Sequence, residues 1–404
     1  MGEPHAAVVG AGIGGLAAAV ALHRRGWRVT VLERAERPRE LGTGLTLMAN
    51  ALRGLDALGL GDAVRRDGRP DTPGGLRTRA GRWLSRIEGA DLEAALGTAA
   101  LGIHRTALHR LLRDALPSGA LRTGVETVGI DATTPSVTCR TDGTTDVLAA
   151  DLVVGADGLN STVRRRLWPE APPPAYSGST AWRAAITWPA PVATAVTWGP
   201  GREFGTVPLG DGRLYWYAAD VAPPGGREPD ELAAVRERFG DWHEPIPALL
   251  AATPPDAVLR TDLLHLDTPL PTYVRGRVAL LGDAAHAMTP HLGQGAGQAI
   301  EDAVVLGAVC ANGTADLAGA LAAYDRQRRP RSQAVARAAL RTARYGQQLR
   351  HPVAVALRDT TIRLIPSRTA LRGMARYTDR QPPHRNPSKY RSPCRGRPNG
   401  KGSR

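Results

Sequence analysis

The sequence has little of what would cross-link a chain or anchor it in a membrane. Its 404 residues include three cysteines, Cys139, Cys310 and Cys394, which lie far apart and match no metal-ligand spacing. The longest apolar stretch, residues 6–22, is broken by glycines and starts as a strand, so it predicts no membrane span. We see no basic leader with a cleavage site. We therefore expect a reduced, cytoplasmic protein without disulfides or a metal site.

Acidic residues are absent from the last part of the chain, where much of the formal net charge of +14 is concentrated. From Arg380 to Arg404 there are eight basic residues and no acidic one, which leaves +6 for the body of the protein. Both lysines of the chain and five prolines lie in the same stretch. This composition predicts a disordered basic tail over residues 377–404, without a specific nucleic-acid partner. A weak attraction to nucleic acid or to an anionic membrane is the alternative.

What the sequence does contain begins with a glycine-rich turn near its start. Residues 6–34 read as an apolar strand, the pattern Gly10-x-Gly12-x-x-Gly15, an alanine-rich helix and a second strand that ends at Glu33. Gly10 permits a tight turn, Gly12 lets the backbone approach a pyrophosphate at the helix N-terminus, and Gly15 allows close packing of helix and strand. Glu33 has the spacing of a carboxylate that binds ribose hydroxyls. These features predict dinucleotide binding, and the alternative is a tight turn in another kind of α/β protein.

Two further motifs end buried strands with an acidic residue. In residues 151–164, a predicted strand ends at Asp157 and a helix follows. In residues 277–303, a predicted strand ends at Asp283, the chain turns at Pro290, and a long helix begins within Gly293–Gly297. The carboxyl ends of parallel strands are where such a sheet binds ligands, and a glycine-rich helix start offers free N–H groups. Asp283 is thus placed to accept a hydrogen bond from a ribityl hydroxyl.

The segments between these motifs have a different texture. Residues 70–89 and 172–273 read as short antiparallel strands, with one helix near 228–239. Six of the eight tryptophans lie between Trp168 and Trp242, so we expect this sheet to form a pocket wall. Elsewhere the pattern predicts a glycine-rich loop at 42–45 and a helix over 103–112.

Polar residues of the predicted sheet are candidates for substrate contact. The period of two in a strand places Tyr215 and Tyr217 on one face. Arg183 belongs to a neighbouring predicted strand, where its guanidinium can bind an anion through two hydrogen bonds. Simple packing of the tyrosines and a local carboxylate partner for Arg183 are equally good interpretations of the residues alone.

Taken together, the three motifs resemble the class A flavoprotein monooxygenases with the p-hydroxybenzoate hydroxylase fold. The resemblance covers about residues 5–345, and the segments 180–183 and 295–302 are similar to the salicylate, hydroxybenzoate and urate hydroxylases and to zeaxanthin epoxidase relatives. It implies an α/β fold with a Rossmann-like FAD-binding domain, an inserted antiparallel-sheet substrate domain and C-terminal helices. It also implies FAD as cofactor, NAD(P)H and dioxygen as co-substrates, and a monomer or homodimer that acts on a small aromatic molecule.

The resemblance implies roles for individual residues as well. Glu33 and Arg34 would contact the AMP half of FAD, and Arg105 the middle of the cofactor. Asp157 would serve FAD and NAD(P)H binding, and Asp283 the ribityl chain. The predicted cofactor-binding residues are Gly10, Gly12, Gly14, Gly15, Glu33, Arg34, Arg105, Asp157, Asp283, Gly293, Gly295, Ala296 and Gly297. For Arg105, an exposed helix arginine is an equally good interpretation.

We predict a discontinuous arrangement of domains. The FAD-binding domain comprises residues 1–70, 90–171 and 274–345, and the substrate domain residues 71–89 and 172–273. A C-terminal helix region follows at 346–376, before the basic tail at 377–404. Arg328 and its neighbours resemble closing helices of the family that pack on the FAD-binding domain, and the alternative is a solvated helix face with salt bridges.

The expected chemistry is hydroxylation. NAD(P)H reduces the flavin, dioxygen adds to its ring, and the resulting hydroperoxide transfers one oxygen atom to an electron-rich substrate. We predict Arg183, Tyr215, Tyr217 and His291 as substrate-binding residues, with His291, Arg183 and Tyr217 also catalytic. His291 stands where the family often has asparagine, and the alternative is a loop histidine exposed to water. His286 is a usual family residue, which we interpret as structural.

Other flavin chemistries compete with this interpretation. The sequence lacks the Trp-x-Trp-x-Ile-Pro segment of flavin-dependent halogenases. A FAD-dependent reductase or cyclase without oxygen transfer, and a non-catalytic flavin-binding protein, are the open alternatives.

Overall fold

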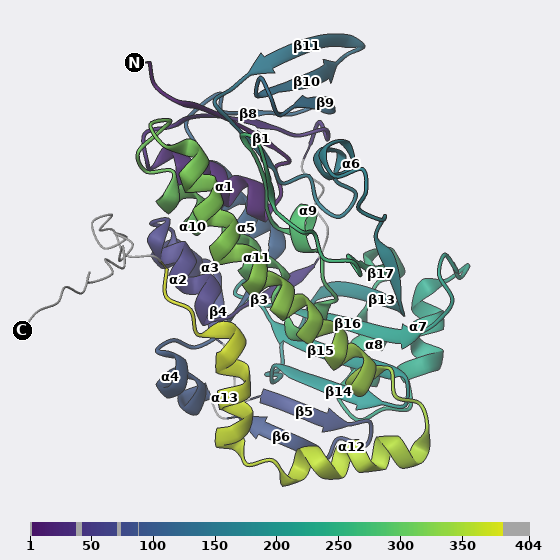
Figure 1. The fold of residues 1–404 in the computed structure, drawn as a ribbon. Coiled ribbons are helices and arrows are strands. Elements are labelled where there is room, and N and C mark those ends of the chain that lie inside the picture. The colour runs from purple at the N-terminus through teal and green to yellow at the C-terminus, as the bar shows by residue number, and fades with distance from the viewer. Residues whose placement is uncertain (1, 38–42, 71–73, 88, 383–404) are drawn as a thin grey trace, which may run out of the picture.

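The computed structural model describes residues 2–37, 43–70, 74–87 and 89–382. It is a mixed α/β protein built on two large sheets, one covered by long helices and the other by helices α7 (Glu231–Phe239) and α8 (Ile246–Ala252) (Figure 1). The predicted fold class is confirmed. Most of the predicted basic tail, residues 383–404, lies outside the described residues.

The first sheet has six strands in the order β18-β19-β12-β1-β2-β8, parallel except for the edge pair β18 and β19. Its strands are β1 (His5–Val9), β2 (Arg28–Leu32), β8 (Leu121–Arg122), β12 (Leu152–Gly155), β18 (Val274–Arg275) and β19 (Val278–Leu280). The central strand β1 is buried along its whole length, and helix α1 (Ile13–His23) packs against it.

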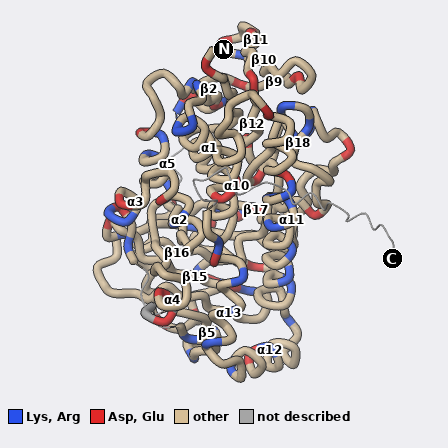
Figure 2. The backbone as a smooth tube through the Cα atoms, turned by 60° about the vertical axis from the view of Figure 1, so that its left-hand side comes forward, with Lys and Arg blue, Asp and Glu red and all other residues tan. Residues whose placement is uncertain are grey.

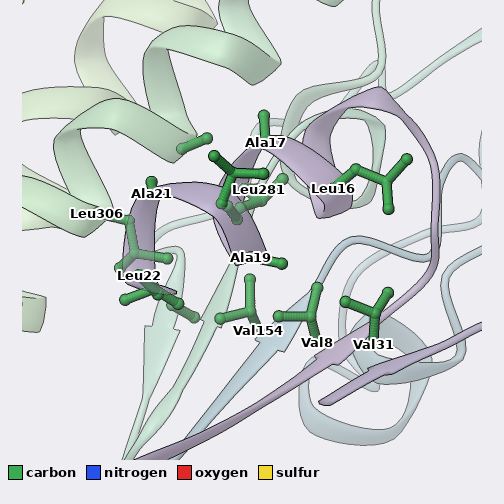
Figure 3. Packing of buried hydrophobic residues seen from close by; sticks show 14 of the residues in the cluster. Val8, Leu16, Ala17, Ala19, Ala21, Leu22, Val31, Val154, Leu281 and Leu306 are labelled. Carbon is green, nitrogen blue, oxygen red and sulfur yellow. The ribbon is translucent and has the colours of Figure 1, made fainter. Parts of the chain in front are cut away.

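Two helices with small residues pack together beside this sheet. They are α1 (Ile13–His23) and α10 (Gly295–Val309), and α11 (Leu317–Thr342) packs along α10. A methyl group added at Gly307 would lie 2.7 Å from Ala21 Cβ, so the glycine is what permits this approach. Figure 3 shows the side chains of Leu281 and Leu306 packed along α1, beside Ala17 and Ala21.

The second sheet has seven strands in the order β17-β13-β16-β15-β14-β5-β6, antiparallel except for the pair β14 and β5. Its strands are β5 (Gly74–Thr78), β6 (Trp83–Ile87), β13 (Ala175–Thr187), β14 (Ala195–Gly199), β15 (Arg202–Pro208), β16 (Arg213–Val221) and β17 (Leu259–His265). Strands β5 and β6 thus share one sheet with the five strands between residues 175 and 265.

Two of the tryptophans of this sheet lie in a hydrophobic core and not at a pocket wall. Trp182 and Trp216 point to the outer face of the sheet, where they pack with Phe204, Phe239 and Trp242 beneath α7 and α8. The rings of Phe204 and Trp216 stack with their centroids 5.5 Å apart. These aromatic side chains therefore form a second hydrophobic core.

Two small sheets complete the strands. One is β3 (Gly44–Leu47), β7 (Leu101–His104) and β4 (Arg69–Pro70), and the other is β9 (Glu126–Asp131), β10 (Ser136–Thr141) and β11 (Thr144–Ala149). Gly44 and Leu45 pair with His104 and Ile103. The predicted loop is therefore wrong at Gly44 and Leu45, which belong to β3, while residue 42 lies outside the described residues. The predicted helix start at Ile103 is also wrong, because Ile103 and His104 belong to β7. The helix begins at Arg105.

The remaining helices are mostly short. They are α2 (Ala49–Ala57), α3 (Gly61–Asp67), α4 (Gly89–Leu96), α5 (Arg105–Asp114), α6 (Thr162–Leu167), α9 (Asp283–His286), α12 (Pro352–Leu364), α13 (Ser367–Thr378), η1 (Pro255–Ala257), η2 (Pro290–Leu292) and η3 (Ala343–Gln347). No helix among the described residues has the length and apolar character needed to span a bilayer. Figure 2 shows basic and acidic residues interspersed through the fold.

The end of the described chain is packed. Thr378 is buried, and Arg331 Nη2 donates a hydrogen bond to Tyr377 O over 3.0 Å. Arg380 lies 3.9 Å from Glu301. The prediction of disorder from residue 377 is therefore wrong for residues 377–382, which contact α10 and α11.

Candidate active site

The three sequence motifs meet at the carboxyl ends of β1, β12 and β19. A methyl group added at Gly10 would lie 2.5 Å from Ala156 O and 2.9 Å from Asp157 Cα. One added at Gly14 would lie 2.9 Å from Leu281 Cδ1 and 3.1 Å from Ala299 Cβ. The first turn of α1 therefore touches both other motifs, as expected for parallel strands that end at one edge.

The glycines of the first motif differ in what surrounds them. Gly10 has φ +100°, a backbone conformation that favours glycine. A methyl group at Gly15 would lie 2.0 Å from Gly10 O, so Gly15 closes the turn. Gly12 has no atom within 4 Å of an added Cβ and faces open space. Two glycines thus serve the fold, and Gly12 leaves room beside the helix N-terminus.

Glu33 holds the turn by hydrogen bonds. Its Oε2 accepts from Ala11 N and its Oε1 from Ala35 N, each over 2.9 Å. A carboxylate offers about four acceptor sites, so two are left for ribose hydroxyls. Arg34 beside it is exposed, as is Arg105 at the start of α5. Arg34 follows the end of β2, and Arg105 begins α5 directly after β7.

Asp157 has a role that the sequence interpretation did not include. Its Oδ1 accepts from Ser161 Oγ over 2.5 Å, and its Oδ2 accepts from Thr162 N over 2.6 Å and from Val163 N over 3.1 Å. These contacts fix the N-terminus of α6. Most of the acceptor capacity of Asp157 is therefore used inside the protein.

Asp283 is exposed at the start of α9, directly after Gly282 with φ +58°. A hydrogen bond fixes the backbone of this turn, because Gly282 N donates to Asp302 Oδ2 over 2.9 Å. His286 Nε2 contacts the same oxygen at 2.6 Å and is buried, which supports a structural role for this histidine. Asp302 thus positions the Asp283 turn.

Asp302 belongs to a buried cluster that we call the ion seam: Glu301 and Asp302 on α10, and Arg328 and Arg331 on α11. Arg328 is fully buried and donates to Asp302 Oδ1 over 2.6 Å and to Glu301 Oε2 over 2.5 Å. Arg331 donates to both oxygens of Glu301, over 2.6 Å and 2.7 Å. The interpretation of Arg328 as part of a solvated face is wrong, since its guanidinium is enclosed by acceptors.

Electrostatics keep the seam ionised. Burial opposes the charge of Asp302, but the charges of His286 and Arg328 outweigh it, and the pKa of Asp302 is lowered to about 2. Burial likewise disfavours the charge of Arg328, yet Asp302 and Glu301 raise the pKa of its guanidinium. The seam is therefore a set of paired permanent charges.

A few residues away, polar atoms are buried without partners. These atoms lie in residues 289–294, which contain η2 and lead into α10. We call this segment the unpaired loop. Among the described residues, Thr289 Oγ1, both ring nitrogens of His291, and Gln294 Nε2 have no hydrogen-bond partner although each atom is buried. The alternative of a water-exposed His291 is therefore wrong, because its ring nitrogens are enclosed. Unpaired buried polar atoms are costly and point to a ligand.

The N-termini of α1 and α10 are also unsatisfied. Neither has a side-chain cap or an acidic residue in its first turn. Methyl groups added at Gly293 and Gly295 would meet no atom within 4 Å. Two positive helix ends and glycine-lined open space suit a pyrophosphate and an electron-rich ring. The residues present therefore fit FAD.

One face of the seven-stranded sheet carries polar side chains, and we call it the tyrosine face: Arg183 on β13, Glu203 on β15, and Tyr215 and Tyr217 on β16. Arg183 pairs in register with Tyr217. The two tyrosine rings lie with centroids 6.1 Å apart, which confirms that they share a face. Arg183 Nη1 donates to Thr261 Oγ1. The predicted substrate residues from this sheet are thus adjacent.

The tyrosine face meets the small sheet of β3 and β7. A methyl group added at Gly44 on β3 would lie 2.6 Å from Tyr215 Cβ. Burial raises the pKa of Tyr215, while the nearby charges of Arg183 and Arg105 oppose the rise. The charges of Arg183 on the substrate sheet and of Arg105 at the start of α5 thus both act on Tyr215.

Glu203 is a candidate residue that the sequence interpretation missed. It is only 4% exposed, and its Oε2 accepts a hydrogen bond from Trp198 Nε1 over 2.7 Å. Its signal in the sequence was weak: one acidic residue in an otherwise apolar strand run, Glu203 to Pro208. The described residues contain no group of histidine, cysteine, aspartate and glutamate suited to a metal ion.

Comparison with known proteins gives consistent matches. Residues 3–339 match the family described as FAD binding domain. The chain is 38% identical to the aurachin C monooxygenase/isomerase of Stigmatella aurantiaca, over 84% of this chain and 89% of that protein. It is 35% identical to a 2-heptyl-3-hydroxy-4(1H)-quinolone synthase of Pseudomonas aeruginosa, over 89% of this chain and 94% of that protein.

A solved structure agrees with these relatives. HpxO of Klebsiella pneumoniae, complexed with FAD and uric acid, superposes with a TM-score of 0.86 and 28% identity. The match covers 93% of this chain and 96% of that one.

Proposed function

The chain belongs to the family of FAD-dependent aromatic monooxygenases, and on that premise we propose that the unpaired loop and the tyrosine face hold its substrate. The family assignment makes the protein an enzyme that uses FAD, NAD(P)H and dioxygen to hydroxylate an aromatic or other electron-rich small molecule. It decides against a reductase or cyclase without oxygen transfer, and against a non-catalytic flavin-binding protein.

We propose the following residues for FAD. The turn from Gly10 to Gly15 holds the pyrophosphate at the N-terminus of α1, with Glu33 on the adenosine ribose. Asp283 accepts from the ribityl chain, and Gly293–Gly297 lie against the ring system. The open space at Gly12, Gly293 and Gly295 supports this assignment. Arg34 and Arg105 retain their proposed contacts with the AMP half and the middle of the cofactor, and the contribution of Asp157 is indirect, through α6.

When bound, FAD accepts a hydride from NAD(P)H and supplies one oxygen atom of dioxygen to the substrate. The protein's own part is to position groups and exclude water. The positive end of α10 stabilises negative charge that develops on the ring system. His291 offers the substrate one donor or acceptor at each ring nitrogen, in an enclosed loop where proton transfer is controlled.

The observation that carries this proposal is the set of buried, unpaired polar atoms in residues 289–294 beside glycine-lined open space. Within a folded protein such atoms are normally satisfied. A planar substrate with polar substituents would supply their partners.

For the substrate we propose a small nitrogen-containing aromatic ring. The named products and ligands of two similar proteins, a 4(1H)-quinolone and uric acid, are of this class. The domain boundaries predicted from the sequence, a monomeric or homodimeric state and a cytoplasmic location belong to the same proposal.

The test is a product assay on the FAD-loaded protein. A panel of hydroxyquinolines, purines and hydroxybenzoates is screened for stimulated NAD(P)H oxidation under labelled dioxygen. We expect at least one ring to stimulate oxidation and to gain one labelled oxygen atom. Stimulated oxidation that yields hydrogen peroxide and no labelled product, across the panel, would contradict the proposal.

A further inference from the structure

Resting on the proposed function, we propose that Glu203 determines which hydrogen-bonding group the substrate must present. Glu203 accepts a hydrogen bond from the Tyr217 hydroxyl, so the remaining lone pairs of the Tyr217 oxygen are left to accept from the substrate. The site then selects rings with an N–H or O–H donor at that position and disfavours carboxylates. Glu203 is thereby a positioning residue, because it acts through Tyr217.

The backbone of β15 brings the two groups together. Gly205 pairs with Tyr217 in the antiparallel register and lies two residues from Glu203 on the same face. A methyl group added at Gly205 would lie 2.1 Å from Tyr217 Cε1 and 2.5 Å from its hydroxyl oxygen. The tyrosine ring therefore crosses β15 directly over Gly205, two residues from Glu203 on the same face, and the negative charge of Glu203 acts on its hydroxyl.

The direction of this hydrogen bond follows from the chemistry of the partners. An ionised carboxylate only accepts, so the hydroxyl must donate. Burial first, and then the negative charge of Glu203, raise the pKa of Tyr217 well above its ordinary value. Tyr217 thus keeps its proton, so we assign it a positioning role in place of the catalytic role predicted from the sequence.

Arg183 and Tyr215 complete the pattern. The positive charge of Arg183 acts on the Tyr215 hydroxyl, and because a guanidinium has donors only, the tyrosine oxygen can only accept from it. The hydroxyl hydrogen of Tyr215 is then left to donate. The tyrosine face therefore offers acceptor character at Tyr217 and donor character at Arg183 and Tyr215, which matches a ring that carries an N–H and a carbonyl.

The charges of the face point the same way. Arg183 is accompanied by a carboxylate on the same face, Glu203, which is almost completely buried. A substrate carboxylate bound there would gain from Arg183 but would approach a second negative charge in a poorly hydrated site. In place of the anion predicted from the sequence, we therefore propose that Arg183 binds a neutral carbonyl group of the substrate.

The variant Glu203→Gln tests the proposal by reversing the hydrogen bond. Trp198 Nε1 is a donor only, so the amide oxygen of the glutamine is needed there and its NH₂ group faces Tyr217. The Tyr217 hydroxyl must then donate elsewhere, toward the substrate. The probes are 4(1H)-quinolone, a neutral N–H donor, and salicylate, a carboxylate.

Binding is measured by perturbation of the flavin absorption spectrum in the FAD-loaded protein. We expect wild type to bind the quinolone more tightly than salicylate. In Glu203→Gln, quinolone affinity should fall about tenfold and salicylate affinity should rise about tenfold, as expected when one buried hydrogen bond is lost and another gained. Equal shifts for both probes, or a wild type that prefers salicylate or gives a signal with neither probe, overturn the proposal.

A matched control exists on the other face of the same sheet. Glu231 Oε2 accepts from Trp182 Nε1 over 2.7 Å, the same kind of bond at the same length as that of Glu203. Glu231→Gln should leave both probe affinities within about twofold of wild type. A change as large as that of Glu203→Gln would show a general effect on the sheet and would contradict the proposal.

The variant Tyr217→Phe separates positioning from a purely structural role. If Glu203 acts through Tyr217, the quinolone loss in Tyr217→Phe and in Glu203→Gln should not add in the double variant. Additive losses overturn the proposal. These outcomes are distinct from failure of the proposed function, because the probes report ligand affinity in a flavin-loaded protein whether or not a labelled product forms.

Discussion

The ion seam and the unpaired loop lie close together along the chain, but their buried polar groups differ in whether they have hydrogen-bond partners. In the seam, Arg328 is enclosed by Asp302, Glu301 and Gln298, and its three nitrogens are all hydrogen-bonded. In the loop, both ring nitrogens of His291 and the amide nitrogen of Gln294 are buried without partners. The first arrangement is complete by itself, and the second becomes complete with a ligand.

The comparison teaches how to separate structural from functional polar residues in this protein. Burial alone does not distinguish them, since His286 and His291 both have buried ring nitrogens. What differs is the partner: His286 Nε2 contacts Asp302 at 2.6 Å and leaves only Nδ1 unpaired, whereas neither ring nitrogen of His291 has a hydrogen-bond partner among the described residues. We therefore expect changes in the seam to affect folding, and changes in the loop and the open glycines to affect ligand binding.

The largest effect on stability is expected for Arg328→Met. Removal of the guanidinium leaves Asp302 and Glu301 as buried charges with fewer partners, which costs about 3–5 kcal/mol of unfolding free energy. Denaturant unfolding of the apoprotein measures this loss. Arg329→Ala is the control, because Arg329 is 31% exposed and makes an ordinary i,i+4 pair with Asp325, so it should cost less than about 1 kcal/mol. Equal losses in the two variants would break the comparison.

Alanine at two glycines of the first motif should give opposite phenotypes. At Gly12, with φ −71° and open space, a methyl group is compatible with the fold but occupies the ligand's place. We expect FAD affinity to fall about 100-fold, or ~2.7 kcal/mol, with apoprotein stability unchanged. At Gly15 the methyl group would lie 2.0 Å from Gly10 O and should destabilise the apoprotein itself. Flavin fluorescence titration and thermal unfolding measure the two effects, and loss of stability in Gly12→Ala would count against the account.

The seam should also respond to acid. The pKa of Asp302 is lowered to about 2 in the folded protein, from an ordinary value of 3.8. The ionised Asp302 therefore contributes about 2 kcal/mol to the free energy of unfolding at pH values above its ordinary pKa, and this contribution is lost as the pH falls from there toward 2. The stability difference between wild type and Asp302→Asn should therefore shrink by this amount between pH 6 and pH 2. A difference that is independent of pH would show that Asp302 is not held ionised.

The smallest effect on stability is expected for His291→Ala. The substitution removes buried polar atoms that have no protein partner, so the unfolding free energy should change by less than about 0.5 kcal/mol. Substrate-stimulated NAD(P)H oxidation should fall about tenfold, with FAD retained. His286→Ala is the counterpart and should lose stability instead. A destabilised His291→Ala protein with normal turnover would reverse our assignment of the two histidines.

The sequence predicted the parts of the site that depend on local rules. Glycine spacing, an acid at the end of a strand and the period of two located Gly10, Glu33, Asp283 and the tyrosine pair. Their convergence follows from parallel strand order. The family resemblance supplied the cofactor and the order of domains.

Contacts between distant elements were beyond those rules. The burial of Arg328 depends on α10 and α11 lying side by side, and the enclosure of Glu203 depends on Trp198 from the neighbouring strand. The strand at Ile103 and His104 was read as helix because its pairing partner, β3, lies far away in the sequence. The capping role of Asp157 required the position of α6, and the period of two does not say which face of the sheet α7 and α8 cover.

The most direct test of the central claim is hydrogen exchange of the apoprotein with and without FAD. If the unsatisfied helix ends and the unpaired loop form the ligand site, FAD should protect the amides of residues 10–15 and 289–297. Exchange in α7 and α8, which cover the outer face of the seven-stranded sheet, should be unchanged. Protection confined to other segments, with residues 289–297 exchanging as in the apoprotein, would contradict the account.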